Sequence, residues 1–319
     1  MNSKKKFIVS HAPFWHYGSS VSERSYHWIL AALPAVIIGL SHYGIGALAV
    51  VTLSVSMAIF WELAFNVVAK RPITIADGNA ALLGLVFAML VPATFPWWAV
   101  LVGTFVVVVI GKHIFGGIGA NAFHPVVLAT AILSISWPHL LDFDAMLVNY
   151  DFSFYTVFPP LAIKYWGPGA LDHVSYLDLL LGRQVGGVGT TFGLGLIAGG
   201  IYLILRGFVR WEIPLSFLAG VFVTALLFHM ASPETYAGPL VHLLVGYTLI
   251  GAFFLAPEDA SSPVNFVPML IYGATGGVLT VLIRNIGAYT DGVIYAILVI
   301  NLIHPLIDKI RPKAVGKVV

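Results

Sequence analysis

Ten long apolar segments run through the chain, and they constrain its fold more than any other feature. About 20 apolar residues are enough for a helix to cross the ~30 Å hydrocarbon core of a bilayer. The chain is 59% hydrophobic and only 9% charged, whereas a soluble domain is about 25% charged. We therefore predict an all-α integral membrane protein, because most of these segments are longer than barrel strands. The predicted spans are 26–43, 45–68, 78–92, 97–112, 125–137, 189–206, 213–230, 239–256, 265–283 and 290–307.

The third and fifth of these spans are short for a bilayer, and we expect half-helices or steeply packed pieces there. The basic residues suggest an orientation. If the amino terminus is cytoplasmic and the spans alternate, thirteen of the 16 Lys and Arg residues lie inside, and only Lys164, Arg183 and Arg284 lie outside. Such an excess of cytoplasmic cations is typical of membrane proteins. We expect both termini in the cytoplasm and the segment 138–188 outside.

Short motifs in the first half of the sequence recur in similar form in the second half. Leu90-Val91-Pro92 is similar to Leu255-Ala256-Pro257, and Lys112-His113-Ile114 is similar to Arg284-Asn285-Ile286. Each half has five spans, so the halves point in opposite directions and predict an inverted repeat with sites at the repeat interface. Chance similarity between apolar strings is the alternative. The predicted division is a cytoplasmic segment 1–25, repeats 26–137 and 189–308, an outer cap 138–188 and a cytoplasmic tail 309–319.

A glycine-rich stretch lies between the fourth and fifth spans. Gly116, Gly117 and Gly119 remove side chains from the backbone just after a span ends, and Asn121 and His124 follow. Non-helical backbone at the depth of a bilayer is stable only where it is buried in protein or lines a cavity. Bare amides and polar side chains in such a place can bind a cofactor or substrate. An ordinary helix–helix turn is the alternative interpretation.

Two acidic residues are candidates for an ion path. Glu62 lies inside the second span, and Asp77 opens the third. A carboxylate in apolar surroundings is costly, so Glu62 should face the bundle interior, a partner or a water path. We interpret both residues as candidates for a cation or proton path. The alternatives are an interfacial acid at a helix end for Glu62 and a helix cap for Asp77.

The composition argues against several kinds of site. The chain has no cysteine, so it cannot hold an iron–sulfur cluster on its own thiolates. Its 11 histidines include no pair with the clear geometry of a transmembrane haem site. No stretch matches a phosphate-binding loop, a zinc motif or a hydrolase nucleophile motif. Gly273 lies in a small-residue stretch that predicts close helix packing. We expect no haem, no metal site and no nucleic-acid partner.

Short motifs follow one another in a fixed order from about Phe7 to Pro312. They include Trp61-Glu62, Asp77-Gly78, Gly111–Pro125, Trp211–Leu218, Gly251–Phe254, Leu282–Arg284 and Pro305–Asp308. Together they resemble the D subunit of Rnf-type ion-translocating electron-transport complexes, which is related to the B subunit of the sodium-pumping NADH:quinone reductase. The resemblance implies a ten-helix inverted-repeat fold similar to urea transporters, in a bacterial or archaeal inner (cytoplasmic) membrane.

The resemblance also implies a function: the membrane core subunit of a redox-driven Na⁺ or H⁺ translocating oxidoreductase complex. The implied partners are other membrane and peripheral subunits that carry flavin and iron–sulfur centres, with a quinone as a further candidate. In the family a flavin sits near a Gly-Gly-x-Gly-x-Asn loop. That implies a non-covalent flavin, either riboflavin or FMN, at Gly116, Gly117, Gly119 and Asn121. His124 stands where the family usually has a second Asn, and it can still donate a hydrogen bond.

One family motif is incomplete in this chain. Members usually carry an Asp-Gly-x-Ser-Gly-Ala-Thr motif before the sixth span, and its threonine forms a phosphoester to FMN. The corresponding stretch here keeps Asp172 and Ser175 but lacks the Ala-Thr pair. We therefore predict no covalent FMN, with Ser175 as a remote attachment candidate. The missing motif leaves two alternatives open, namely a passive small-solute transporter or channel on the same fold, and a cofactor-free structural subunit.

Overall fold

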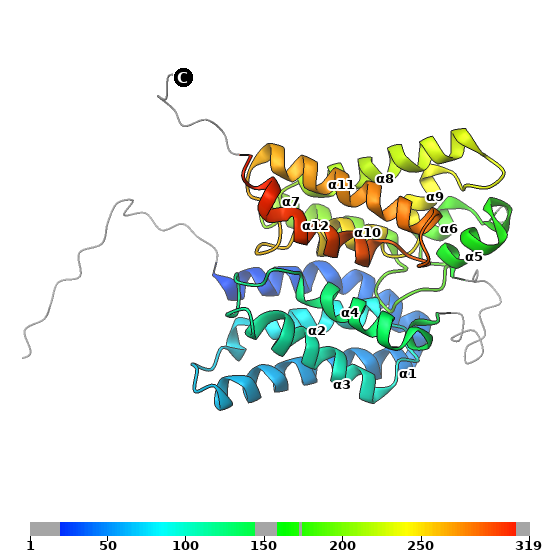
Figure 1. Ribbon diagram of the computed structural model, residues 1–319. Helices are drawn as coiled ribbons and strands as arrows, with labels where there is room; N and C mark the ends of the chain where they lie inside the picture. Colours follow the sequence, from blue (N-terminus) through cyan, green and yellow to red (C-terminus); the bar gives the residue numbers. More distant parts are fainter. Residues whose placement is uncertain (1–19, 144–157, 172–173, 311–319) are drawn as a thin grey trace, which may run out of the picture.

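The computed structural model describes residues 20–143, 158–171 and 174–310, and all of their regular structure is helical. Figure 1 shows two groups of helices, one above the other. We call residues 20–136 the first bundle and residues 193–307 the second bundle. The first bundle holds α1 (Val21–Val68), η1 (Ile75–Asp77), α2 (Asn79–Leu90), α3 (Trp97–Phe105), the π-helical η2 (Val106–His113) and α4 (Pro125–Ser136).

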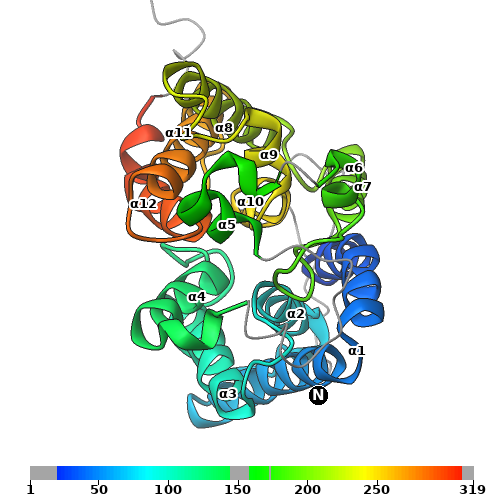
Figure 2. The same cartoon turned by 90° about the vertical axis from the view of Figure 1, so that its right-hand side faces the viewer.

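The second bundle and its connection to the first are also helical. The connection contains η3 (Pro138–Leu141), α5 (Pro159–Trp166), η5 (Pro168–Leu171) and α6 (Tyr176–Leu180). Figure 2 shows α5 and α6 against the second bundle. That bundle holds α7 (Gly193–Leu205), α8 (Glu212–Ala231), α9 (Pro239–Leu244), α10 (Thr248–Ile250), the π-helical η6 (Gly251–Leu255), α11 (Phe266–Asn285) and α12 (Val293–Ile307).

The long helix α1 reverses direction at Gly44. A straight helix of 48 residues would be about 70 Å long. Gly44 instead has φ 60° and ψ −139°, a conformation that glycine adopts readily. The Ser22 hydroxyl lies 3.5 Å from the carbonyl oxygen of Ala76, so the start of α1 lies close to the segment that follows its end. The element is therefore two antiparallel helices, which confirms the predicted break between 26–43 and 45–68.

Three helices, α1, α8 and α11, are long and apolar enough to cross a membrane, and several shorter apolar helices accompany them. The predicted short third and fifth spans appear as α2 and α4, each with 12 residues and so about 18 Å long. The predicted span 239–256 is not one helix. It is interrupted between α9 and α10, where Gly246 has φ 64°.

Small residues bring α8 and α11 close together. A Cβ atom at Gly273 would lie 2.0 Å from the Ser216 hydroxyl, and one at Gly277 would lie 2.1 Å from the Phe217 carbonyl oxygen. Only glycine permits this approach, as is common between membrane helices. The predicted small-residue packing at Gly273 is confirmed.

The carboxyl end of α2 joins the two bundles. The last carbonyl groups of a helix have no partner within it. Here Gly189 donates its amide proton to Met89 at 3.0 Å, Val188 donates to Val91 at 3.1 Å, and the Tyr247 hydroxyl donates to Leu90 at 2.7 Å. The end of a half-length helix thus lies inside protein, where its free carbonyl groups are satisfied.

Candidate functional site

The glycine-rich loop, residues 114–124, connects η2 to α4. Gly116, Gly117 and Gly119 have φ values of 125°, 109° and 84°, a region that side chains make unfavourable. A Cβ at Gly117 or Gly119 would meet no atom of residues 20–143, 158–171 or 174–310 within 4 Å. Glycine is therefore required by the backbone conformation at these two positions and not by a neighbouring group, so their backbone is left uncovered.

A cavity of about 320 Å³ lies beside this loop, and we call it the loop cavity. Gly119 and His124 line it from the loop, and Trp28 and Asn79 line it from α1 and α2. Its other wall comes from the second bundle, including Phe254, Glu258 and Asp259. The loop cavity therefore lies at the junction of the two bundles.

Asn121 connects the loop to the second bundle. Its side chain is buried, and its amide donates hydrogen bonds to the Glu258 carboxylate at 3.2 Å and to the Phe123 carbonyl at 3.1 Å. The other oxygen of Glu258 accepts from the amide and the hydroxyl of Ser261, at 2.9 and 2.7 Å. The Glu258 carboxylate is thus held in one orientation against the cavity.

His124 ends the loop and caps α4. Its Nδ1 accepts a hydrogen bond from the Val126 amide at 3.2 Å, so this nitrogen carries no proton. Burial lowers the pKa of His124, and the nearby Glu258 carboxylate only partly opposes the shift. His124 also donates its backbone amide proton to Asn301 at 3.1 Å, and Asn301 in turn donates to the Tyr272 hydroxyl at 2.7 Å. The neutral imidazole of His124 therefore fixes the loop to α4, and its backbone amide fixes the loop to α12.

Glu62 lies in a buried ionic cluster at the start of the loop. Its side chain is fully buried, and its oxygens lie 2.9 and 3.0 Å from the Lys112 ammonium. His113 lies 2.9 Å from the same carboxylate, and the Thr74 hydroxyl donates to it at 2.7 Å. Because Lys112 and His113 end η2, the carboxylate predicted for the ion path also anchors the loop.

Asp77 is placed differently from Glu62. Its carboxylate accepts a hydrogen bond from the Asn79 amide at 2.8 Å, at the start of α2, and so satisfies one of the free amides there. The structure brings Glu62 and this turn together through Thr74, three residues before Asp77. A role of either residue in ion movement stays a prediction. Among the described residues, no three His, Asp or Glu side chains gather as a metal site requires.

The sequence did not reveal the partners of Arg284. This side chain is 1% exposed, and its guanidinium donates to Asp291 at 3.1 Å, to the Thr248 hydroxyl at 3.1 Å and to the His242 carbonyl at 3.1 Å. Asp291 follows Arg284 by only seven residues, and this short separation in the sequence is the signal that could have revealed the pair. Arg284 matches Lys112 in the proposed repeat, and each is a buried cation paired with a carboxylate.

Ser175 caps the start of α6, where its side chain accepts a hydrogen bond from the Leu177 amide at 3.2 Å. It lines a separate cavity of about 420 Å³ together with Tyr176 and His229. Asp172, the other retained residue of the covalent-flavin motif, lies outside the described residues. Nothing in this geometry links Ser175 to the loop cavity.

Comparison with known proteins supports the resemblance. The family model described as NQR2, RnfD, RnfE family matches residues 8–316. The chain is 33% identical over 317 residues to the D subunit of the proton-translocating ferredoxin:NAD(+) oxidoreductase complex of Clostridium ljungdahlii, covering 96% of this chain and 95% of that protein. It is 34% identical over 303 residues to the D subunit of the Na(+)-translocating ferredoxin:NAD(+) oxidoreductase complex of Acetobacterium woodii, covering 94% and 92%.

A third relative has a more general name. The chain is 30% identical over 345 residues to the D subunit of the ion-translocating oxidoreductase complex of Aliivibrio salmonicida, and the match covers 97% of this chain and 98% of that protein. The family match and these relatives all cover nearly the whole chain, so they include the glycine-rich loop and both bundles. The chain therefore belongs to the NQR2, RnfD, RnfE family.

Proposed function

We propose that this chain is the D-type membrane subunit of a complex that couples electron transfer between ferredoxin and NAD⁺ to the translocation of Na⁺ or H⁺. The observation that carries the proposal is the match along nearly the full length to subunits so named. The partners are the other subunits of the complex, which supply flavin and iron–sulfur centres. The chain itself has no cysteine for such a cluster.

The proposal includes a ten-span inverted repeat in the inner membrane with both termini in the cytoplasm. The reversal at Gly44 supports two spans within α1. The matching places of Lys112 and Arg284, each buried and paired with a carboxylate, support a repeat. The distribution of Lys and Arg supports the orientation, which puts the glycine-rich loop on the cytoplasmic side.

We assign a non-covalent flavin to the loop cavity. The uncovered backbone at Gly119, the buried His124 and the Trp28 ring provide the amide, polar and aromatic surfaces that a flavin ring needs. The charges favour an uncharged flavin. Arg24 lines the cavity but is already paired with Asp259, which leaves the Glu258 carboxylate to oppose the phosphate of FMN. Riboflavin is therefore the better candidate.

When bound, the flavin would accept and pass on electrons, and its reduction would change the charge in the cavity. The residues of this chain determine which parts of the structure that change in charge affects. Glu62 holds the start of the loop on the first bundle, and Glu258 and Asn301 hold its end on the second. A change at the loop therefore acts on both bundles. It can favour one arrangement of the bundles over another only if the flavin interacts differently with the two arrangements.

The test is to delete the gene and to restore it in a strain that contains the partner subunits. Membranes with the chain should carry out ferredoxin-dependent NAD⁺ reduction with coupled ion uptake, and membranes without it should lose both. Proteoliposomes that contain only this chain test the alternative. Solute uptake through them without any redox partner, together with unchanged electron transfer in the deletion strain, would favour a passive transporter and contradict the proposal.

A further inference from the structure

A cavity of about 230 Å³ lies at the start of α8, and we call it the arginine cavity. Arg210 lines it from the turn before α8, and Arg24 lines it from the first turn of α1. Ser262 and Val264, just before α11, form another part of its wall. The cavity therefore lies where the starts of α1, α8 and α11 come together.

Arg210 is an unpaired charge in this cavity. The guanidinium of Arg24 is paired with the Asp259 carboxylate and also donates to the Phe208 carbonyl at 3.0 Å. The side chain of Arg210 is exposed and forms no ion pair or hydrogen bond with any of the residues that the structure describes. Two guanidinium groups and one carboxylate line the cavity, which leaves a net charge of +1 there. One phosphodiester would balance that charge.

Two neighbouring carboxylates, those of Glu212 and Glu258, do not line the arginine cavity. Glu258 already accepts hydrogen bonds from Asn121 and Ser261. Glu212 is buried, and within the described part of the chain it forms no ion pair with Arg210. The guanidinium of Arg210 is therefore available to a ligand.

A buried hydroxyl also lines the cavity. Ser262 is 7% exposed, and its hydroxyl makes no hydrogen bond to residues 20–143, 158–171 or 174–310. The neighbouring Ser261 hydroxyl, in contrast, donates to Glu258 at 2.7 Å. A polar group that is buried without a partner costs free energy, so the Ser262 hydroxyl needs a partner that enters the cavity. A phosphate oxygen can accept from this hydroxyl and from the Arg210 guanidinium together.

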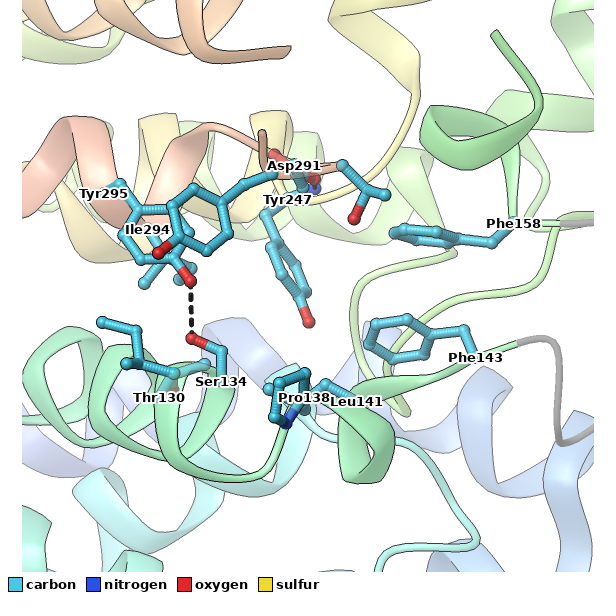
Figure 3. A pocket seen from close by; sticks show the side chains of 13 residues that line it. Thr130, Ser134, Pro138, Leu141, Phe143, Phe158, Tyr247, Asp291, Ile294 and Tyr295 are labelled. Carbon is cyan, nitrogen blue, oxygen red and sulfur yellow. Dashed lines mark hydrogen bonds between the residues drawn. The ribbon is translucent and has the colours of Figure 1, made fainter. Parts of the chain in front are cut away.

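Another cavity, shown in Figure 3, has a different charge. It lies between the two bundles, where the hydroxyls of Ser134 and Tyr295 are hydrogen-bonded at 2.8 Å, and it has a volume of about 290 Å³. None of the described residues that line it is Lys, Arg or His. An anion would lose its water there without meeting a cation, which is costly. An anionic ligand therefore favours the arginine cavity.

Exposed apolar side chains surround the arginine cavity. Val264 in its wall is 69% exposed, and Phe266 and Leu215, in the first turns of α11 and α8, are exposed as well. Trp211 is also exposed, and its ring meets Phe266 edge-on with ring centres 6.4 Å apart. Both helices are long enough to cross a membrane, and Figures 1 and 2 show them at the edge of the second bundle away from the first. Since Trp is enriched at the depth of lipid headgroups, the cavity opens at that depth, beside the acyl chains.

From these observations we infer that the arginine cavity binds the phosphate of an anionic phospholipid. The Arg210 guanidinium and the Ser262 hydroxyl would donate to the phosphate oxygens, and the acyl chains would lie along the exposed side chains at the starts of α8 and α11. Basic pockets between membrane helices are suited to such headgroups. A headgroup that also carries an ammonium would bring a further cation to a cavity where Asp259 is already paired. The inference goes beyond the proposed function and does not depend on a flavin.

Photolabelling with lipids tests this inference. The purified complex is placed in phosphatidylcholine nanodiscs that contain a small fraction of a diazirine-labelled phosphatidylglycerol or, in parallel, of the phosphatidylcholine with the same diazirine. Labelled residues are then mapped by mass spectrometry. The phosphatidylglycerol probe should label residues 205–215 or 262–269 several-fold more than the phosphatidylcholine probe. Equal labelling of these residues by the two probes, or labelling confined to other residues, would overturn the inference.

Three variants sharpen the result. Arg210→Gln should lower the phosphatidylglycerol label about tenfold, because a hydrogen bond to a charged group contributes about that much affinity. Ser262→Ala should also lower it. Arg71→Gln is the matched control, because Arg71 is exposed, does not line the cavity and lies on the same side of the membrane in the proposed orientation. An equal loss of label in Arg71→Gln would show attraction to surface charge in general and would overturn the site.

A soluble phosphate is the other source of the same chemistry. Potassium phosphate, compared with potassium chloride at equal ionic strength, should not reduce the phosphatidylglycerol label. A reduction by phosphate but not by chloride would show that the cavity takes a soluble anion, and it would overturn the lipid as the ligand. Ferredoxin-dependent NAD⁺ reduction, measured on the same samples, tests the proposed function separately.

Discussion

Asn121 donates a hydrogen bond of 3.2 Å to Glu258, although 137 residues separate them in the sequence. The bond ties the glycine-rich loop of the first bundle to the second bundle at the wall of the loop cavity. Glu258 is itself fixed by Ser261, so the amide meets a carboxylate of defined orientation. The relationship makes the loop a bridge between the bundles as well as a wall of the cavity.

Replacing Asn121 with Leu should weaken flavin binding. The change removes a hydrogen bond to a charged group, worth about 1.5–3 kcal/mol, and a loss of ~1.4 kcal/mol is tenfold in affinity. We expect flavin retention in the purified complex to fall at least tenfold. Asn285→Leu is the matched control, because the amide nitrogen of Asn285 is buried with no hydrogen-bond partner among the described residues, and Asn285 does not line the loop cavity. Full flavin content in Asn121→Leu would show that this hydrogen bond does not support flavin binding.

Replacing Gly117 with Ala tests the backbone of the loop. A Cβ there would have free space, but φ 109° is strongly unfavourable for alanine, and such strain costs about 1–3 kcal/mol. We expect a lower melting temperature and a loss of bound flavin. Gly238→Ala is the control, since a Cβ there also has free space while φ is −65°. Equal effects of the two substitutions would show that backbone conformation is not what the loop requires.

The neutral state of His124 predicts a pH dependence. Burial holds its folded-state pKa below the ordinary value of 6.5, so the unfolded chain binds this proton more readily. The stability that neutral His124 contributes is therefore fully present above about pH 6.5 and is lost as the pH falls through the folded-state pKa. His124→Asn keeps a capping side chain without this titration. Between about pH 7.5 and 5.5 its melting temperature should fall less than that of the wild type, and parallel curves would contradict the prediction.

Replacing Glu62 with Gln should reduce ion uptake more than electron transfer. The change also leaves Lys112 buried without its counter-charge, which costs about 3–5 kcal/mol. Thermal stability must therefore be measured alongside both activities, and the double variant Glu62→Leu with Lys112→Met should recover the stability but not the uptake. Glu212→Gln is the control, because Glu212 is also buried, but one of its oxygens has no hydrogen-bond partner in the part of the chain that the structure describes. If the ratio of ion uptake to electron transfer in Glu62→Gln equals that of the wild type, Glu62 is not part of the ion path.

Much of the helical layout could be predicted from the sequence because it depends on local apolar length. The break at Gly44 and the ends of α8 and α11 agree with the predicted spans to within about two residues. The interruption between α9 and α10 was missed, because hydropathy does not report the conformation of Gly246. The role of Glu258 was missed for another reason. Its partner Asn121 is distant in sequence, and only the folded chain brings an amide to that carboxylate.

The ionic clusters show the same limit. Glu62 could be singled out because a carboxylate inside an apolar span is unusual, but its pairing with Lys112 depends on how α1 packs against η2. The glycines predicted a non-helical break at this loop, and Gly116, Gly117 and Gly119 do have positive φ angles. What a bare backbone binds is not encoded in that conformation, so the flavin remains a proposal.

The decisive measurement is the cofactor content of the purified native complex, since it shows whether the loop cavity holds a non-covalent flavin. Acid denaturation, chromatography of the released flavin and the intact mass of this chain can be obtained from one sample. We expect released riboflavin that the Asn121→Leu variant loses, and a chain whose mass equals that of its sequence without added FMN. Released riboflavin that is unaffected by changes at Asn121 and Gly117, or a chain that carries covalent FMN and no other flavin, would disprove a non-covalent flavin held at this loop.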